Sequence, residues 1–125
     1  MNILRLSKMT KTWIIDIDGV IFPHNGYLAN QRENPLDGVK KFFNKISSDD
    51  YIILITSRHT KYRNLTERNL SSSGLRYNIL LMGMPKGERI VINDVKASGL
   101  RTAFSICLER DAGFVGLDFL EDETL

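Results

Sequence analysis

Short apolar runs that alternate with longer polar stretches constrain the fold of this chain more than any other feature. The runs are rich in β-branched residues, and three of them end in polar residues: TWIIDID at 12–18, YIILI followed by TSR at 51–58, and RIVIND at 89–94. Runs of this length and composition are typical of strands buried on both faces of a sheet. The alternation therefore predicts an α/β domain with a mostly parallel sheet.

Two helices are expected between these runs. Apolar residues recur at helical spacing from Leu36 to Ile46, after Asn34–Pro35, a cap residue followed by a proline suited to a first helical turn. Residues 60–73 form the second expected helix, with Gly74 as its C-terminal cap.

The remaining segments complete the expected order of elements. Residues 78–82 and 102–108 read as further strands, which brings the sheet to about five strands in a Rossmann-like three-layer domain. Asn25-Gly26 within the irregular segment 20–34 indicates a small hairpin. Cys107 is expected in the core, and the acidic tail 121–124 is expected to be solvated.

Length and charge narrow the class of protein. The 125 residues suit a single domain, residues 1–125, and the net charge of only +2 gives no support for a nucleic-acid or membrane partner. A single cysteine excludes an internal disulfide and fits a reducing compartment. Because MNILRLSKMTK lacks the apolar stretch of a secretory signal, the expected location is cytoplasmic.

The tetrapeptide Asp16-Ile17-Asp18-Gly19 is the most informative motif. Its two carboxylates leave the strand on the same side, and Gly19 permits a sharp turn directly afterwards. Like charges this close repel unless a cation or a proton lies between them, and a hard divalent ion such as Mg²⁺ meets that need. The alternative is an Asp-Gly turn in which the acids only cap a loop.

Polar residues after the other runs extend this motif into a candidate site, because ligands bind at the carboxyl ends of parallel strands. A hydroxyl at Thr56 can donate to a phosphoryl oxygen, or it can cap the next helix. Arg58 can bind a phosphate or lie solvated, and Asp94 can complete a metal site or cap a helix. Lys86, in the loop before Asp94, is a candidate cation or an ordinary surface lysine.

These motifs resemble those of the haloacid dehalogenase-like superfamily of phosphohydrolases. WIIDIDGV resembles the first motif of that family, YIILITSR the second and RIVINDVK the fourth, in the same order and with fitting spacing. The resemblance extends over most of the chain, from Trp13 to about Leu108.

The resemblance implies a phosphatase that acts through a phosphoaspartyl intermediate. In that scheme Asp16 is the nucleophile, Asp18 is the general acid and then the base, and Thr56 binds the phosphoryl oxygens. Lys86 takes the place of the third-motif lysine, and Asn93 replaces the first of two acids usual in the fourth motif. The resemblance also implies Gly19, Ser57 and Arg58 as substrate-binding residues, and Asp94, the Asp16 side chain and the Asp18 backbone carbonyl as ligands of Mg²⁺.

The intervals between the motifs leave no room for a cap domain. A capless site is covered by a large substrate, by a neighbouring subunit of a homo-oligomer, or by the segment 20–34. Short capless members similar to this chain are associated with bacterial capsule and surface-sugar biosynthesis, which favours a small phosphorylated sugar or a related metabolite as substrate.

Two alternative functions stay open. One is a degenerate domain that binds a phosphorylated ligand or protein partner without turnover. The other is a polynucleotide 3′-phosphatase, which the low net charge supports least.

Overall fold

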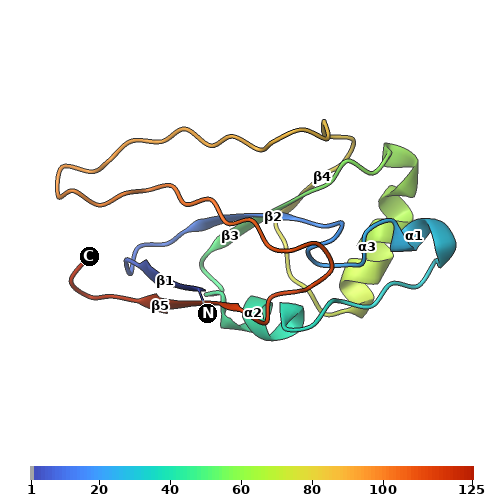
Figure 1. The fold of residues 1–125 in the computed structure, drawn as a ribbon, viewed down its shortest axis with the longest axis horizontal. Helices are drawn as coiled ribbons and strands as arrows, with labels where there is room; N and C mark the ends of the chain where they lie inside the picture. Colours follow the sequence, from blue (N-terminus) through green and yellow to red (C-terminus); the bar gives the residue numbers. More distant parts are fainter. Residues whose placement is uncertain (1) are drawn as a thin grey trace.

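The computed structural model describes residues 2–125 and shows an α/β fold with two small sheets (Figure 1). The larger sheet has the order β2-β3-β4, formed by Thr12–Asp16, Tyr51–Ile55 and Ile79–Leu81. The smaller sheet pairs β1, Asn2–Leu6, with β5, Leu117–Glu121. Every ladder in both sheets is parallel, as the sequence predicts.

Helices connect the strands of the larger sheet. Helix α2, Val39–Lys45, lies between β2 and β3 in the chain, and the 3₁₀ turn η1, Thr60–Tyr62, leads into α3, Arg63–Ser72, before β4. A single helical turn, α1, spans Gly26–Ala29. None of the helices described in residues 2–125 is long and apolar enough to cross a membrane.

The core is formed where the larger sheet meets α2 and α3. The side chains of Ile15, Leu54 and Leu80, one from each strand of the sheet, are buried. An aromatic cluster extends this core to the smaller sheet: the Trp13 ring lies 5.0 Å from that of Phe119 on β5. The two sheets therefore share one hydrophobic cluster although no backbone hydrogen bonds join them into one sheet.

Several expectations are confirmed. The strand at 51–55 is found with its expected bounds, the first run forms a strand over 12–16, and β4 lies within the predicted 78–82. The helix expected at 60–73 is present as η1 and α3. Gly74 follows it with a φ of +70°, the left-handed conformation of a C-terminal cap, and the Leu75 N–H donates to Leu70 O.

The expected start of the first helix is wrong. Helix α2 begins at Val39, after Gly38 with a φ of +76°, and not at Asn34–Pro35. The residues before it stay outside the helix and make other backbone bonds: Leu36 N–H donates to Ile21 O at 2.7 Å, and Asp37 O accepts from Phe114 N–H at 2.8 Å. The hairpin expected at Asn25-Gly26 is also wrong, since that position begins α1.

The expected strands at 89–92 and 102–108 are absent, and so is the single five-stranded sheet. Residues 83–108 instead form a long excursion, the projecting arm, that runs out from β4 and returns (Figure 1). Its two legs are joined near the tip by a bridge between Val95 and Arg101, and they form no ladder. Ile92 is 92% exposed, and Cys107 is exposed and not in the core.

The strands β1 and β5 were not expected from the sequence. Each is short and contains charged residues, and the acidic end of β5 was assigned to a solvated tail. Glu121 is exposed, as expected of that tail, and it is also the last residue of β5, opposite Leu6 in the ladder. The two ends of the described chain stabilise one another, an arrangement with no local sequence signal.

Candidate active site

The carboxyl ends of β2 and β3 bring together the first two motifs. After β2 the chain turns at Ile17, whose carbonyl accepts backbone hydrogen bonds from Val20, Ile21 and Phe22. Gly19 has a φ of +79° within this turn, a conformation that L side chains rarely adopt. The sharp turn expected from the Asp-Gly pair is therefore present and directs Asp18 toward β3.

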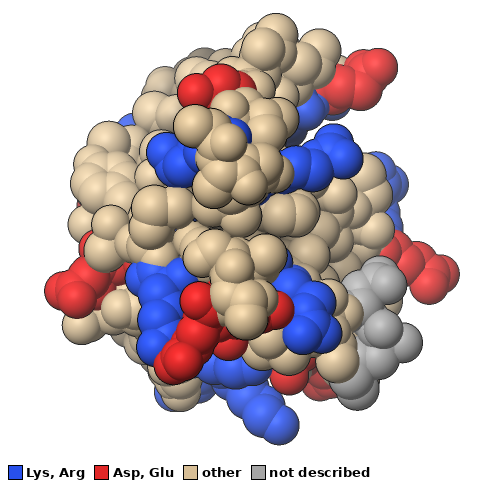
Figure 2. Space-filling model, turned by 90° about the vertical axis from the view of Figure 1, so that its left-hand side faces the viewer, with Lys and Arg blue, Asp and Glu red and all other residues tan. Residues whose placement is uncertain are grey.

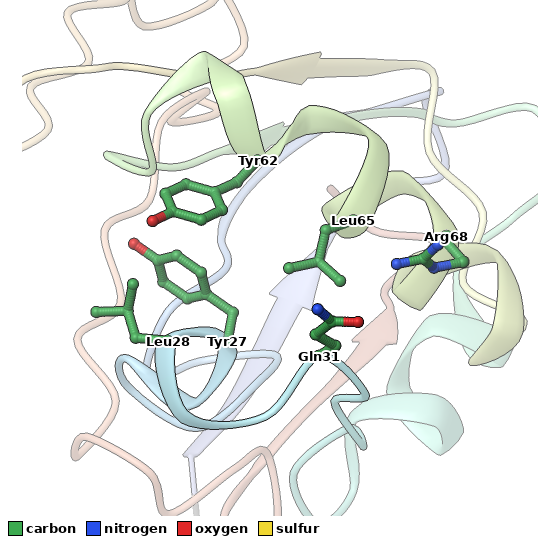
Figure 3. Close-up of a pocket in the computed structure, with 6 residues that line it drawn as sticks. All are labelled: Tyr27, Leu28, Gln31, Tyr62, Leu65 and Arg68. Carbon is green, nitrogen blue, oxygen red and sulfur yellow. The ribbon is translucent and has the colours of Figure 1, made fainter.

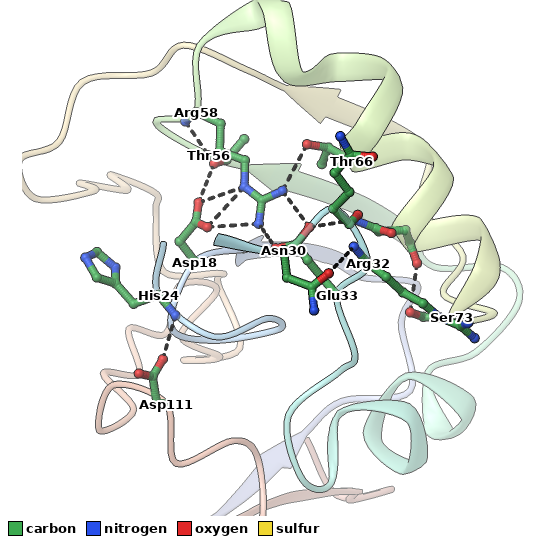
Figure 4. Close-up of polar contacts among 12 residues, drawn as sticks. Asp18, His24, Asn30, Arg32, Glu33, Thr56, Arg58, Thr66, Ser73 and Asp111 are labelled. Carbon is green, nitrogen blue, oxygen red and sulfur yellow. Dashed lines mark hydrogen bonds and ion pairs between the residues drawn. The ribbon is translucent and has the colours of Figure 1, made fainter. Parts of the chain in front are cut away.

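Asp18 is held by two side chains that follow β3 (Figure 4). The Thr56 hydroxyl donates to Asp18 Oδ2 at 2.8 Å, and Arg58 Nε donates to Asp18 Oδ1 at 3.0 Å. Thr56 is fully buried, whereas the Asp18 side chain keeps 16% of its surface exposed. The Asp18 carboxylate therefore stays partly accessible to solvent, and the Thr56 hydroxyl is already engaged in a hydrogen bond to it.

Arg58 is the most deeply buried charged residue of the site. Its side chain is fully buried, and it lies between the carboxylates of Asp18 and Glu33. Burial by itself lowers the pKa of a guanidinium, but hydrogen bonds to Glu33 and Asp18 outweigh it and raise the pKa of Arg58 above its ordinary value. Its guanidinium faces these carboxylates and not the solvent.

Asp16 occupies a different environment from Asp18. Its side chain is 41% exposed, and the nearest cationic group is that of Arg89, at 4.0 Å. Partial burial raises the pKa of Asp16 above the ordinary value of 3.8, although a backbone hydrogen bond and the charge of Arg89 oppose that shift. The Asp16 carboxylate is the more accessible of the two and is suited to attack an electrophile.

Lys86 belongs to the loop that follows β4, and Ser57 follows β3. The loop contacts the end of β3 just before Lys86. Met84 N–H donates to Thr56 O at 3.0 Å, and Ser57 Oγ donates to Pro85 O at 3.4 Å. These bonds fasten the segment just before Lys86 to the strand end that carries the site. Lys86 itself is exposed, and its ammonium group is free to approach an anionic ligand.

Asp94 is not brought to this edge, because it lies near the tip of the projecting arm, next to the bridge between Val95 and Arg101. Among residues 2–125, no three His, Cys, Asp or Glu side chains form a group able to hold a metal ion. Of the implied Mg²⁺ ligands, the Asp16 carboxylate and the Asp18 backbone carbonyl lie at the end of β2 and just after it, and the Asp16 carboxylate is accessible. Mg²⁺ usually keeps several waters and binds through one or two carboxylates, so these two groups would hold the ion, which would neutralise charge on a phosphoryl group.

Glu33, Asp111 and Tyr27 also take part in the architecture of the site. Glu33 accepts two hydrogen bonds from Arg58. Asp111, with a φ of +65°, accepts a hydrogen bond from His24 N–H at 2.8 Å, and its own N–H donates to Gly19 O. The Tyr27 ring centroid lies 4.1 Å from the Arg58 guanidinium carbon. No motif marks these positions, because each depends on contacts between distant segments.

A pocket of about 350 Å³ lies beside this network, between α1 and α3 (Figure 3). The rings of Tyr27 and Tyr62 form one side, and Arg68 lies at the opposite end. The Tyr27 ring also stacks on Arg58, so one residue joins the pocket to the group that holds Asp18. The full lining consists of Tyr27, Leu28, Gln31, Tyr62, Leu65 and Arg68.

Comparison of the chain with protein-family models, with curated proteins and with solved structures gives no match.

Proposed function

We propose that this chain is a phosphomonoester hydrolase of the haloacid dehalogenase-like type. The observation that supports it most is the arrangement of the first two motifs. Asp16 is accessible, Asp18 lies two residues further on, and Thr56 from the next strand donates to Asp18 at 2.8 Å. Two carboxylates in unlike environments suit a reaction that needs a nucleophile and a separate acid–base group.

The proposed reaction has two steps. A carboxylate oxygen of Asp16 attacks phosphorus, the bond from phosphorus to the ester oxygen breaks, and Asp18 gives its proton to the departing alkoxide. Asp18 then accepts a proton from water as the water oxygen attacks the phosphoaspartate. The bond between phosphorus and the Asp16 oxygen breaks, which releases phosphate and restores the Asp16 carboxylate and the protonated Asp18 with which the cycle begins.

Cationic groups beside Asp16 support binding of a phosphoryl group. Arg89 lies 4.0 Å from the Asp16 carboxylate, and Lys86 is exposed on the loop fastened to the end of β3. Fixed positive charge at a phosphoryl group stabilises the transition state. Mg²⁺ dependence is part of the proposal on sequence grounds alone, and no step is assigned to the ion.

The pocket beside Tyr27 supports a small substrate. Its volume of about 350 Å³ lies near the lower end of the range for small-molecule sites, roughly 300–1,000 Å³. Aromatic walls and a guanidinium suit a ring that carries polar or anionic groups, as in a sugar phosphate. The proposal further includes a Rossmann-like core without a cap domain and a location in the cytoplasm. A second subunit of a homo-oligomer would cover the open site.

A phosphate-release assay tests the proposal. The panel comprises sugar phosphates, nucleotides and phosphopeptides, each with Mg²⁺ and with EDTA, and Asp16→Asn is compared with the remote control Asp122→Asn. Turnover of at least one phosphomonoester by the wild type and the control, lost in Asp16→Asn, supports the proposal. Absence of turnover across the panel contradicts it.

A second candidate function is binding of a phosphorylated ligand without turnover. It is favoured by the engagement of Asp18, whose two carboxylate oxygens already accept hydrogen bonds from Thr56 and Arg58. Calorimetry with beryllofluoride and Mg²⁺ separates the two functions. Asp16-dependent binding of this phosphoryl mimic favours catalysis, since beryllofluoride adds to a nucleophilic carboxylate.

A polynucleotide 3′-phosphatase is supported least. Figure 2 shows one face of the molecule, on which acidic and basic side chains are interspersed. The basic side chains on this face form no continuous stripe. Binding to the phosphate backbone requires several clustered lysines or arginines.

A further inference from the structure

Arg58 is connected to four parts of the molecule while its side chain is fully buried (Figure 4). Toward Asp18, its Nε and Nη2 atoms lie 3.0 Å from Oδ1. Toward the segment before α2, Nη1 and Nη2 donate to the two oxygens of Glu33 at 2.9 and 2.5 Å. Nη1 also donates to Thr66 Oγ1 on α3, and the backbone N–H of Arg58 donates to Thr56 Oγ1.

The Glu33 carboxylate is itself fixed. Its side chain is 1% exposed, and Oε2 accepts a further hydrogen bond from Asn69 on α3 at 2.9 Å. Asn69 also donates to the backbone carbonyl of Gln31. The guanidinium is therefore held from its far side by a carboxylate that cannot rotate away, and this fixes the face that it presents to Asp18.

We propose that Arg58 is a positioning residue for Asp18 and that Glu33 fixes Arg58 in place. The inference rests on the proposed phosphatase function. Thr56 and Arg58 together restrain both oxygens of Asp18, so its carboxyl group keeps one orientation at the end of β2. A group that transfers a proton must lie within hydrogen-bond reach of the reacting oxygen, and a displacement of about 1 Å costs on the order of a hundredfold in rate.

The same network joins the site to the segment 20–34. Glu33 and Tyr27 both belong to this segment, and the Tyr27 ring stacks on the guanidinium while it also lines the pocket. The charge of Asp18 contributes, after burial, to a raised pKa of the Tyr27 hydroxyl. The orientation of Asp18 is thus tied to the segment that forms one wall of the pocket.

Leaving-group dependence distinguishes a positioning role from a structural one. A p-nitrophenolate leaves as a stable anion, whereas the alkoxide of glycerol phosphate must receive a proton from Asp18. The value of kcat/KM reports only the steps up to the first irreversible one, the transfer of the phosphoryl group to Asp16. Loss of proton donation therefore lowers kcat/KM for glycerol phosphate and spares p-nitrophenyl phosphate.

The experiment compares Arg58→Lys and Glu33→Gln with wild type and with Arg5→Lys, a change in an exposed ion pair far from the site. Lysine keeps the charge of Arg58 but cannot contact both carboxylates in the same geometry. For Arg58→Lys we expect kcat/KM on glycerol phosphate to fall about a hundredfold. On p-nitrophenyl phosphate we expect a fall of less than about tenfold, with an initial burst of p-nitrophenolate because the later hydrolysis also needs Asp18.

Glu33→Gln keeps the volume of Glu33 and removes its charge. We therefore expect kcat/KM to fall more on glycerol phosphate than on p-nitrophenyl phosphate, by a smaller factor than in Arg58→Lys. This variant carries the test if Arg58→Lys fails to fold, as judged by thermal melting. Equal losses on both substrates, or no loss on either, overturn the positioning role while the phosphatase function stands. A wild type that hydrolyses neither substrate overturns the proposed function and this inference with it.

Discussion

Arg58 and Glu33 form a bidentate ion pair that is shielded from solvent. Two guanidinium nitrogens donate to the two carboxylate oxygens, and the side chains are 0% and 1% exposed. A buried pair of this kind contributes little net stability relative to an apolar pair, but removal of one partner leaves an uncompensated charge. The position of the segment before α2, which carries Glu33, therefore depends on Arg58 after β3 and on Asn69 on α3.

The first prediction concerns this dependence. Arg58→Ala leaves the Glu33 carboxylate buried without its partner, and we expect a loss of about 3–5 kcal/mol in the free energy of unfolding. Arg58→Ala combined with Glu33→Gln should recover part of that loss, because the double variant leaves no buried charge at Glu33 unpaired. Urea denaturation followed by circular dichroism measures both values. A loss below about 1 kcal/mol in the single variant would show that water reaches Glu33.

The second prediction concerns Asp16 and pH. Because burial raises the pKa of Asp16 in the folded chain, its neutral form favours folding below pH 3.8, and this contribution is lost as the pH rises through the folded-state pKa. In EDTA at pH 7 we therefore expect Asp16→Asn to melt at a higher temperature than wild type. The difference should vanish as the pH falls well below 3.8, where Asp16 is protonated in both the folded and the unfolded chain.

Melting curves over this pH range check the second prediction, with Asp122→Asn as control. The pKa of Asp122 is lowered by its hydrogen bonds to Thr124, so its charged form favours folding and the control shift should have the opposite sign. A wild type more stable than Asp16→Asn at pH 7 in EDTA would contradict the prediction.

The third prediction concerns the close approach of Gly113 to the chain before α2. A Cβ at Gly113 would lie 2.2 Å from Asp37 O, and the φ of +77° is unfavourable for any L side chain. We expect Gly113→Ala to cost at least about 2 kcal/mol. Gly87→Ala is the matched control, since nothing lies within 4 Å of its Cβ position. Equal stability of the two variants would show that residues 109–114 do not pack on this segment.

The fourth prediction concerns the projecting arm. Ile92 is 92% exposed and Ile52 is fully buried, so the same truncation to alanine should have unequal effects. We expect Ile92→Ala to change the free energy of unfolding by less than about 0.5 kcal/mol, and Ile52→Ala to lower it by about 2–5 kcal/mol. A comparable loss at both positions would place Ile92 in a buried strand and favour a single larger sheet.

Local patterns predict the part of the fold that carries the first two motifs. The runs at 12–16 and 51–55 form paired parallel strands, although Ile14 is 50% exposed and the strands are not buried on both faces. The polar residues after them converge where a parallel sheet requires. The pairing of Asp18 with Thr56 follows from that convergence. The cap at Gly74 is similarly local, because a helix end needs a residue with positive φ.

Long-range contacts explain what the sequence did not predict. The ladder of β1 and β5 joins the two ends of the described chain. Glu33 becomes significant only because α2 starts late and leaves residues 33–37 outside the helix. The run at 89–92 is as apolar as the other strands, yet no neighbouring strand pairs with it in the described residues. Hydrophobicity predicts burial at such a run but does not specify its partner.

The central claim is that Asp16 becomes phosphorylated during turnover. The most direct measurement is peptide mass mapping of protein quenched in acid during reaction with p-nitrophenyl phosphate and Mg²⁺, for wild type and Glu33→Gln. The account predicts one added phosphoryl group on the peptide that contains Asp16, in a greater fraction of the Glu33→Gln molecules. Phosphate release with no phosphoryl group on that peptide, or with the group on another residue, would contradict the account.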